Sequence, residues 1–239
     1  MTHGSGRRTL PATVLAIMLT LLALAGCSSG RKSGPAQPTP TGATAAPISP
    51  HLPFGNPSQA GTDPNNRLVL RPQFAASWNA RKRNANWVAW RLTTGDIGDT
   101  ERSQFYSDPE IDTPSPKDYT GSGYDRGHLC PSKDRSDTPA NNKAVFTMLN
   151  IIPQAPDNNR GPWEQAERFE RSLAQSGREV YLIAGGAGSH EGFEGLFHGI
   201  NVPKFTWKVI VALEKGKSFP DGQEQAQVFA ILMPNNDSI

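Results

Sequence analysis

The chain has 239 residues, of which 19% are charged, and its 23 glycines and 21 prolines show no collagen-like period. The first acidic residue is Asp63, and from there onward 22 acidic residues face 20 basic ones, which excludes a histone-like polycation. Any attraction for nucleic acid must therefore come from a local cationic cleft, assisted by a bound metal.

The first 26 residues have the pattern of a signal peptide. Arg7 and Arg8 form a positive start, residues 14–25 form an apolar run too short to span a bilayer, and Cys27 follows Leu-Ala-Gly. This pattern resembles a bacterial lipoprotein signal, and the resemblance implies cleavage before Cys27 and lipidation of its thiol. The protein would then be exported and held to a membrane of the cell envelope, facing outward or the periplasm. If Cys27 is incidental, an ordinary signal peptide leads to secretion, and the export route stays open.

Residues 27–62 are predicted to be a tether, with the folded domain at 63–239. Twelve of residues 28–62 are Gly or Pro and none is acidic, which is typical of an extended spacer. The remaining 177 residues are enough to bury a single core. If Cys27 is lipidated, Cys130 has no intrachain partner, and we expect it to be a small buried hydrophobic residue rather than a reactive thiol.

Short apolar runs rich in β-branched and aromatic residues predict five strands. They cover residues 87–92, 144–149, 179–184, 204–213 and 227–233. Trp87 and Trp90 should point to opposite faces of the first strand and be buried rather than stack on bases. In the fourth strand, alternate residues from Phe205 to Leu213 are apolar, so this face should lie on the core.

Residues 162–176 give the clearest helix. Pro162 suits the first helical position, an apolar stripe follows, and Gly177 ends the helix. On the opposite face, Glu164 with Arg168 and Glu167 with Arg171 stand four residues apart and predict ordinary surface ion pairs.

The motif residues lie between these elements. The segment 123–135 reads GYDRGHLCPSKDR, and 150–167 reads NIIPQAPDNNRGPWEQAE. Together they resemble the DNA/RNA non-specific endonucleases with a ββα-metal site. The resemblance implies an α+β fold with a central, mostly antiparallel sheet, hydrolysis of DNA and RNA to 5′-phosphate products, and Mg²⁺ as cofactor with Mn²⁺ as a substitute. It also implies another strand and a closing helix after 227–233, where six residues remain in this sequence.

Phosphodiester hydrolysis needs a group that activates water and groups that offset charge on phosphorus. His128 has a suitable pKa for the first task, and the resemblance implies that it is the general base. Arg102 precedes an aromatic and Asp-Pro segment and matches the arginine that stabilises the transition state, because a guanidinium holds two oxygens at once. The alternative for Arg102 is a solvent-exposed loop residue.

The resemblance assigns the metal to Asn159, whose carbonyl oxygen suits Mg²⁺. The alternative is that Asn159 caps the helix. Glu167 lies eight residues later, about 12 Å along a helix, so it should act on the metal's water shell. Asn150 is expected to help catalysis by donating to His128 or to those waters.

Four residues are given supporting roles. Arg126 is expected to bind a phosphate, and Arg171 is expected either to do the same or to pair with Glu167. Asp125 should fix its loop through backbone N–H groups, and Gly127 should allow a turn where a side chain would obstruct substrate. His190 and His198 are expected to be exposed.

The sequence thus predicts a metal-dependent endonuclease that takes DNA and RNA as substrates and is tethered to a membrane. Two alternatives stay open. One is a surface lipoprotein that binds extracellular nucleic acid without cutting it, and the other is a phosphodiesterase that acts on small diesters.

Overall fold

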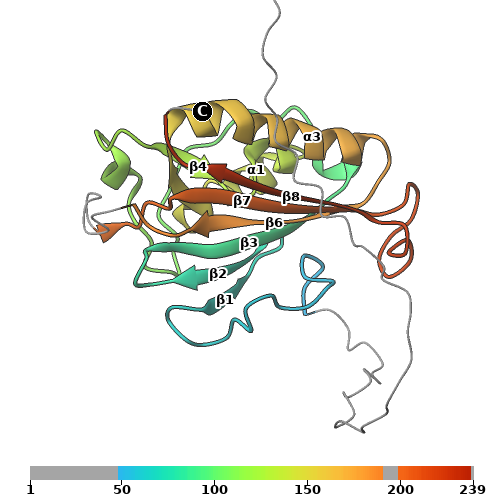
Figure 1. Cartoon of the computed structure of the whole chain (residues 1–239), viewed down its shortest axis with the longest axis horizontal. Coiled ribbons are helices and arrows are strands. Elements are labelled where there is room, and N and C mark those ends of the chain that lie inside the picture. Colours follow the sequence, from blue (N-terminus) through green and yellow to red (C-terminus); the bar gives the residue numbers. More distant parts are fainter. Residues whose placement is uncertain (1–47, 191–198, 238–239) are drawn as a thin grey trace, which may run out of the picture. The chain divides into compact units, whose positions relative to one another are not determined.

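A computed structural model of the chain describes residues 48–190 and 199–237 (Figure 1). The predicted signal peptide, Cys27, most of the predicted tether and His198 lie outside the described residues. No helix in the described ranges is long and apolar enough to cross a membrane.

Six strands form the main sheet, and every printed pairing between them is antiparallel. In spatial order they are β1 (Arg67–Leu70), β2 (Ala75–Asn79), β3 (Asn84–Leu92), β6 (Val180–Ala187), β7 (Phe205–Ala212) and β8 (Gln227–Pro234). The predicted α+β class with a mostly antiparallel sheet is confirmed, and the predicted strands at 87–92, 179–184, 204–213 and 227–233 are present.

The second sheet is a pair of short antiparallel strands, β4 (Asp125–His128) and β5 (Ile151–Gln154). A helical segment follows it and consists of α2 (Pro156–Asn158), a widened turn η5 (Asn159–Trp163) and α3 (Glu164–Gln175). The remaining helix is α1 (Pro139–Ala144), with short 3₁₀ turns η1 (Thr94–Asp96), η2 (Pro116–Tyr119), η3 (Ser132–Arg135) and η4 (Met148–Asn150). In Figure 1, α3 runs along the main sheet beside β7 and β8.

The predicted strand at 144–149 is wrong. Thr138 caps helix α1 by accepting a hydrogen bond from the Asn141 N–H, and Pro139 occupies the first turn, so the chain is helical up to Ala144. The run that follows is apolar because it is buried, and a short buried run does not distinguish strand from helix. The strand begins at Ile151 instead.

The predicted helix at 162–176 is present but its helical segment starts earlier, at Pro156. Gly161 interrupts the backbone with φ −109° and ψ −107°, and Pro162 follows this break. At the other end Gly177 has φ +88°, the left-handed conformation that glycine adopts at helix ends.

The predicted domain boundary at Asp63 is too late. Leu52 and Ala60 are buried against Trp87 of β3, in a cluster on one face of the sheet. Residues 48–62 therefore belong to the fold, and the predicted tether is wrong over this range. Trp90 is buried in the larger cluster. Trp87 and Trp90 thus lie in separate buried clusters, which confirms that they are core residues.

The buried face of β7 is the one that the apolar alternation predicted to be exposed. This face lies toward α3. Phe205 is exposed and Trp207 is half-buried, whereas Lys208 is fully buried. Its ammonium group forms a 2.7 Å ion pair with Glu170 of α3 and lies 4.6 Å from the ring centre of Trp163. The apolar alternation identified the strand correctly but not its buried face, because an ion pair allows a lysine to occupy the core.

We expect Lys208→Met to destabilise the fold by about 3–5 kcal/mol, because it leaves the Glu170 carboxylate buried without its partner. The double variant Lys208→Met/Glu170→Met should recover most of this loss, since it removes both charges. Urea unfolding monitored by circular dichroism measures the effect. A double variant as unstable as the single one would contradict this account of the pair.

Candidate active site

Strands β4 and β5 and the helical segment after them form a ββα unit. His128 ends β4 opposite Ile151, and its carbonyl oxygen accepts a 3.2 Å hydrogen bond from the Trp163 indole, which ties the strand to the helix. Gly127 is packed against Gln154 so closely that an added Cβ would lie 1.8 Å from the Gln154 Oε1 atom. Gly127 is therefore required by packing inside the unit rather than by clearance for substrate.

A cavity of about 380 Å³ opens on this unit, and we call it the active-site cavity. The predicted residues that line it are Arg102, Arg126, His128, Asn159, Glu167 and Arg171. The structure thus brings together side chains that the sequence spreads over some 70 positions.

The His128 imidazole is held by packing between two phenylalanine rings. Ring centres lie 5.2 Å away at Phe105 and 4.7 Å away at Phe146. Its Nε2 atom is buried without a hydrogen-bond partner among the described residues, and the residue lines the cavity. Burial, together with the nearby charge of Arg102, lowers the pKa of His128 to about 3. The ring is therefore neutral at pH 7, in the form that accepts a proton.

Asn159 is oriented by Asp125. The Asn159 amide nitrogen donates to the Asp125 carboxylate at 2.9 Å, and Arg160 binds the same carboxylate through two bonds of 2.7 and 2.8 Å. Burial raises the pKa of Asp125, but the bonds from Arg160 and Asn159 outweigh it and lower that pKa, so the carboxylate stays ionised. The predicted backbone role of Asp125 is wrong, since its bonds go to these side chains.

This arrangement leaves the Asn159 carbonyl oxygen free among the described residues. It accepts no bond from a described backbone N–H, and Asn159 has helical φ and ψ angles rather than the extended ones of a helix N-cap. The capping alternative for Asn159 is therefore wrong.

Glu167 and Arg171 lie one turn apart on α3. Arg171 is buried and binds Asp134 at 3.2 Å, while the Glu167 carboxylate lies 4.0 Å from the same nitrogen. Arg171 thus pairs with carboxylates, and Asp134 is its closer partner. Burial raises the pKa of Glu167 to about 7, although Lys208 opposes this shift. The other predicted pair, Glu164 with Arg168, is present on the surface at 3.0 Å.

Arg102 and Arg126 bring two further cations to the cavity. The exposed Arg102 guanidinium lies 5.3 Å from the ring centre of Phe146, and no described carboxylate pairs with it. Arg126 stacks on Phe105 and donates to the Pro116 carbonyl through Nε and Nη2. Arg102 is therefore available to an anion, whereas Arg126 is partly committed to the scaffold.

Asn150 does not line the cavity, and its amide nitrogen donates to backbone carbonyls, so the predicted donation to His128 is wrong. It is fully buried. Its Oδ1 atom accepts a bond from the Cys130 N–H, and its Nδ2 atom donates to the carbonyls of Cys130 and Val145. Asn150 fixes the chain directly after His128. Cys130 is buried as predicted, and burial raises its thiol pKa. His190 is half-buried and contacts the Asn235 carbonyl, so it is less exposed than predicted.

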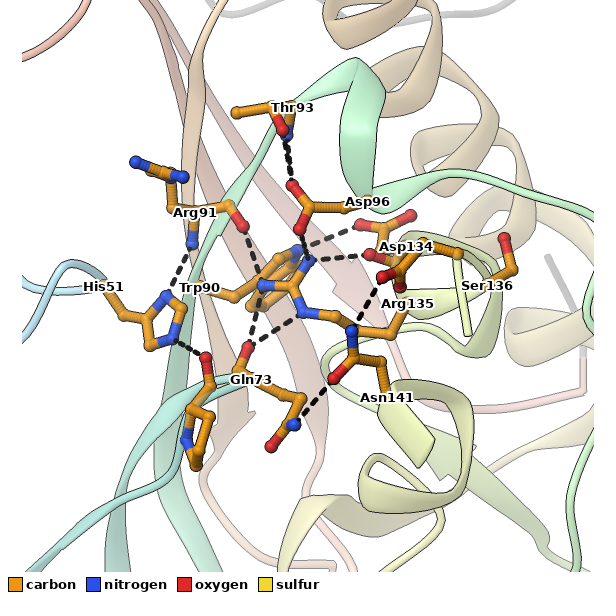
Figure 2. Close-up of polar contacts among 12 residues, drawn as sticks. His51, Gln73, Trp90, Arg91, Thr93, Asp96, Asp134, Arg135, Ser136 and Asn141 are labelled. Carbon is orange, nitrogen blue, oxygen red and sulfur yellow. Dashed lines mark hydrogen bonds and ion pairs between the residues drawn. The ribbon is translucent and has the colours of Figure 1, made fainter. Parts of the chain in front are cut away.

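The turn η3 supplies residues that the sequence analysis missed. Asp134 is fully buried and also accepts a bond from the Trp90 indole at 2.9 Å. Arg135 donates to the carbonyls of Gln73, Arg91 and Asp134, which fastens the turn to the main sheet (Figure 2). Only Lys133 of this turn is exposed. In the sequence, the charged run KDR does not indicate that Lys133 is exposed while Asp134 and Arg135 are buried.

Comparisons with known proteins agree with the site. Residues 56–238 match the model of the DNA/RNA non-specific endonuclease family. The chain belongs to this family. It is 37% identical over 235 residues to a nuclease of Nostoc sp., and this alignment covers 94% of this chain and 83% of that protein. It is also 30% identical over 202 residues to nuclease C1 of Cunninghamella echinulata, covering 77% and 75% of the two chains.

The fold is similar to that in a crystal structure of the EndoG/EndoGI complex. The TM-score is 0.65 at 23% identity, with 81% of this chain and 82% of that chain covered. The chain is thus a non-specific nuclease by its family, and its sheet and ββα unit follow that fold.

Glu167 should make the stability of this endonuclease depend on pH. Its pKa rises on folding from 4.5 to about 7, so the folded state binds the proton more tightly, and stability falls as the pH rises between these values. Glu167→Gln removes this penalty, and we expect it to stabilise the protein at pH 8 by about 1–3 kcal/mol and to have little effect at pH 4.5.

The measurement is urea unfolding in EDTA at both pH values. Glu164→Gln is the matched control, because the Glu164 side chain is 42% exposed, against 17% for that of Glu167. Equal effects of Glu167→Gln at the two pH values would contradict the raised pKa.

Proposed function

We propose that the protein is a Mg²⁺-dependent endonuclease that cleaves DNA and RNA and leaves 5′-phosphates. The observation that carries this proposal is the unpartnered, neutral His128 imidazole in one cavity with Arg102 and Asn159. Mn²⁺ is proposed as a substitute for Mg²⁺, since both prefer oxygen ligands.

The residues present fit a hard divalent cation. The Asn159 carbonyl oxygen has no hydrogen-bond partner among the described residues, and the Glu167 carboxylate lines the same cavity. No three His, Cys, Asp or Glu side chains gather into a ligand cluster in the described ranges. Asn159 would hold the ion directly and Glu167 would bind its water shell. When bound, Mg²⁺ supplies positive charge to the phosphate oxygens.

The chain's own groups provide the rest of the chemistry. His128 takes the proton of the attacking water on its imidazole ring. Arg102 binds the phosphate oxygens, where negative charge develops. An arriving phosphate also offsets the Arg102 charge, one of the two causes that lower the pKa of His128, so the substrate makes the imidazole a stronger base.

The geometry disfavours a protein that only binds nucleic acid. Binding requires cations, which the cavity has, but it does not require a buried imidazole without a partner or an asparagine held by Asp125. The alternative of a small-diester phosphodiesterase is tested by the length of the substrate. An endonuclease should cleave long nucleic acids better than short ones, whereas a small-diester phosphodiesterase should not.

His128→Ala should lower turnover of plasmid DNA by about 10² to 10⁴-fold, because the general base is lost. Asn159→Ala should also lose activity, but raising Mg²⁺ should restore part of it in this variant and none in His128→Ala. Plasmid cleavage by the full chain is followed on gels across a Mg²⁺ titration, with EDTA as the zero-metal control.

Two results would refute this assignment. Cleavage that persists in EDTA would exclude the metal. A His128→Ala variant with near-normal turnover would remove His128 from the mechanism.

We also propose that lipidated Cys27 attaches the enzyme to a membrane of the cell envelope. The support is the sequence alone, in which a positive start and an apolar run end at Leu-Ala-Gly-Cys. A single acyl chain binds membranes only marginally, so stable attachment implies more than one chain on Cys27. Cys27→Ser should move nuclease activity from the membrane fraction to the soluble fraction of lysed cells. Unchanged partition of this variant would refute the anchor.

A further inference from the structure

A second cavity adjoins the active-site cavity, and we call it the adjoining cavity. Its volume is about 510 Å³. It shares four lining residues with the active-site cavity, namely Arg102, Ser132, Lys133 and Arg171. It continues along α3 as far as Arg168 and Gln175, and Gly98 to Thr100 line it as well. The two cavities therefore lie side by side along a shared wall, and we call the two together the groove.

The groove is cationic in a domain whose overall charge is not. Six arginine or lysine side chains line the two cavities against three acidic ones. From Asp63 onward, by contrast, acidic residues outnumber basic ones by 22 to 20. A local positive groove of this kind attracts a polyanion, and its walls concentrate the field.

Two of the six cations are free to bind an anion, and both line the two cavities. The other four are engaged: Arg160 by Asp125, Arg126 by the Pro116 carbonyl, Arg168 by Glu164 and Arg171 by Asp134. Arg102 and Lys133 have no ion-pair partner among the described residues, and both line the two cavities.

Lys133 is presented to the groove by a rigid turn. Its neighbours Ser132, Asp134 and Arg135 are all buried, and Arg135 is bonded to three carbonyls (Figure 2). The Ser132 hydroxyl accepts a bond from Asn142 at 3.0 Å. A lysine on such a fixed backbone loses less freedom on binding than one on a mobile loop.

We propose that the adjoining cavity seats the nucleotide next to the bond that is cut, and that Lys133 binds its phosphate. This inference rests on the proposed function, because it takes Arg102 and His128 as the place of the scissile phosphate. It makes Lys133 a residue that favours polymeric substrate. A small diester has a single phosphate, which lies at Arg102 and His128, so it offers no second phosphate for Lys133 to bind.

Binding is tested without cleavage in the His128→Ala background. The probe is a fluorescent 15-nucleotide oligothymidylate, and its dissociation constant is measured at several KCl concentrations. Each phosphate contact with a single strand adds about 0.7 to the magnitude of the slope of log K against log salt. Lys133→Gln should therefore reduce this magnitude by about 0.7 and weaken binding about fivefold to tenfold near physiological salt. Lys133→Arg should retain the slope.

The matched control is Lys143→Gln, because Lys143 is exposed on α1 and lines neither cavity. We expect it to leave the slope unchanged. In the active protein, kcat/KM is compared for the oligonucleotide and for bis(4-nitrophenyl) phosphate. The loss caused by Lys133→Gln should be larger for the oligonucleotide by the same fivefold to tenfold factor.

The outcomes separate this inference from the proposed function. Slopes that are equal for Lys133→Gln and Lys143→Gln, equal losses on the two substrates, or no binding of the oligonucleotide would each overturn the inference. A His128→Ala protein that still cleaves would overturn the proposed mechanism, while the slopes would continue to report on Lys133.

Discussion

The site depends on the burial of carboxylates beneath α3. Glu170 and Asp134 are fully buried, and the Glu167 carboxylate lies 4.0 Å from Arg171, which also binds Asp134. Uncompensated carboxylates at such positions would be neutralised or would disrupt packing. Lys208 from β7 and Arg171 from α3 supply the opposite charges at 2.7 and 3.2 Å. The sheet therefore determines where the helix can lie, and the helix in turn places Glu167 at the cavity.

A second constraint acts on the side of β4. Asp125 is joined to Asn159 and Arg160, so the first residue of the strand is connected directly to the start of the helical segment. At the other end of β4, the Trp163 indole bonds the carbonyl of His128. Strand and helix are thus fixed at two points, and the distance between His128 and Asn159 has little freedom to vary. A preorganised arrangement of this kind is what catalysis by positioned groups requires.

The sequence predicted the motif residues better than their partners. His128, Asn159 and Glu167 were identified from an ordered motif, and the structure places them in one cavity. Asn150 belongs to the same motif, yet it stabilises the backbone at Cys130. A motif alone does not distinguish residues that contact substrate from residues that support them. Lys208 was missed as a core residue, since an isolated lysine in an alternating strand indicates solvent when its partner Glu170 is 38 positions away.

The packing of residues 48–62 also determines where the domain can be shortened. Leu52 lies with Trp87 on one face of the sheet, whereas α3 and the main core lie on the other. A domain cut at Asp63 would lose Leu52 and Ala60 and uncover part of the apolar cluster around Trp87. A truncated protein that keeps both faces of the sheet covered therefore has to begin before Leu52.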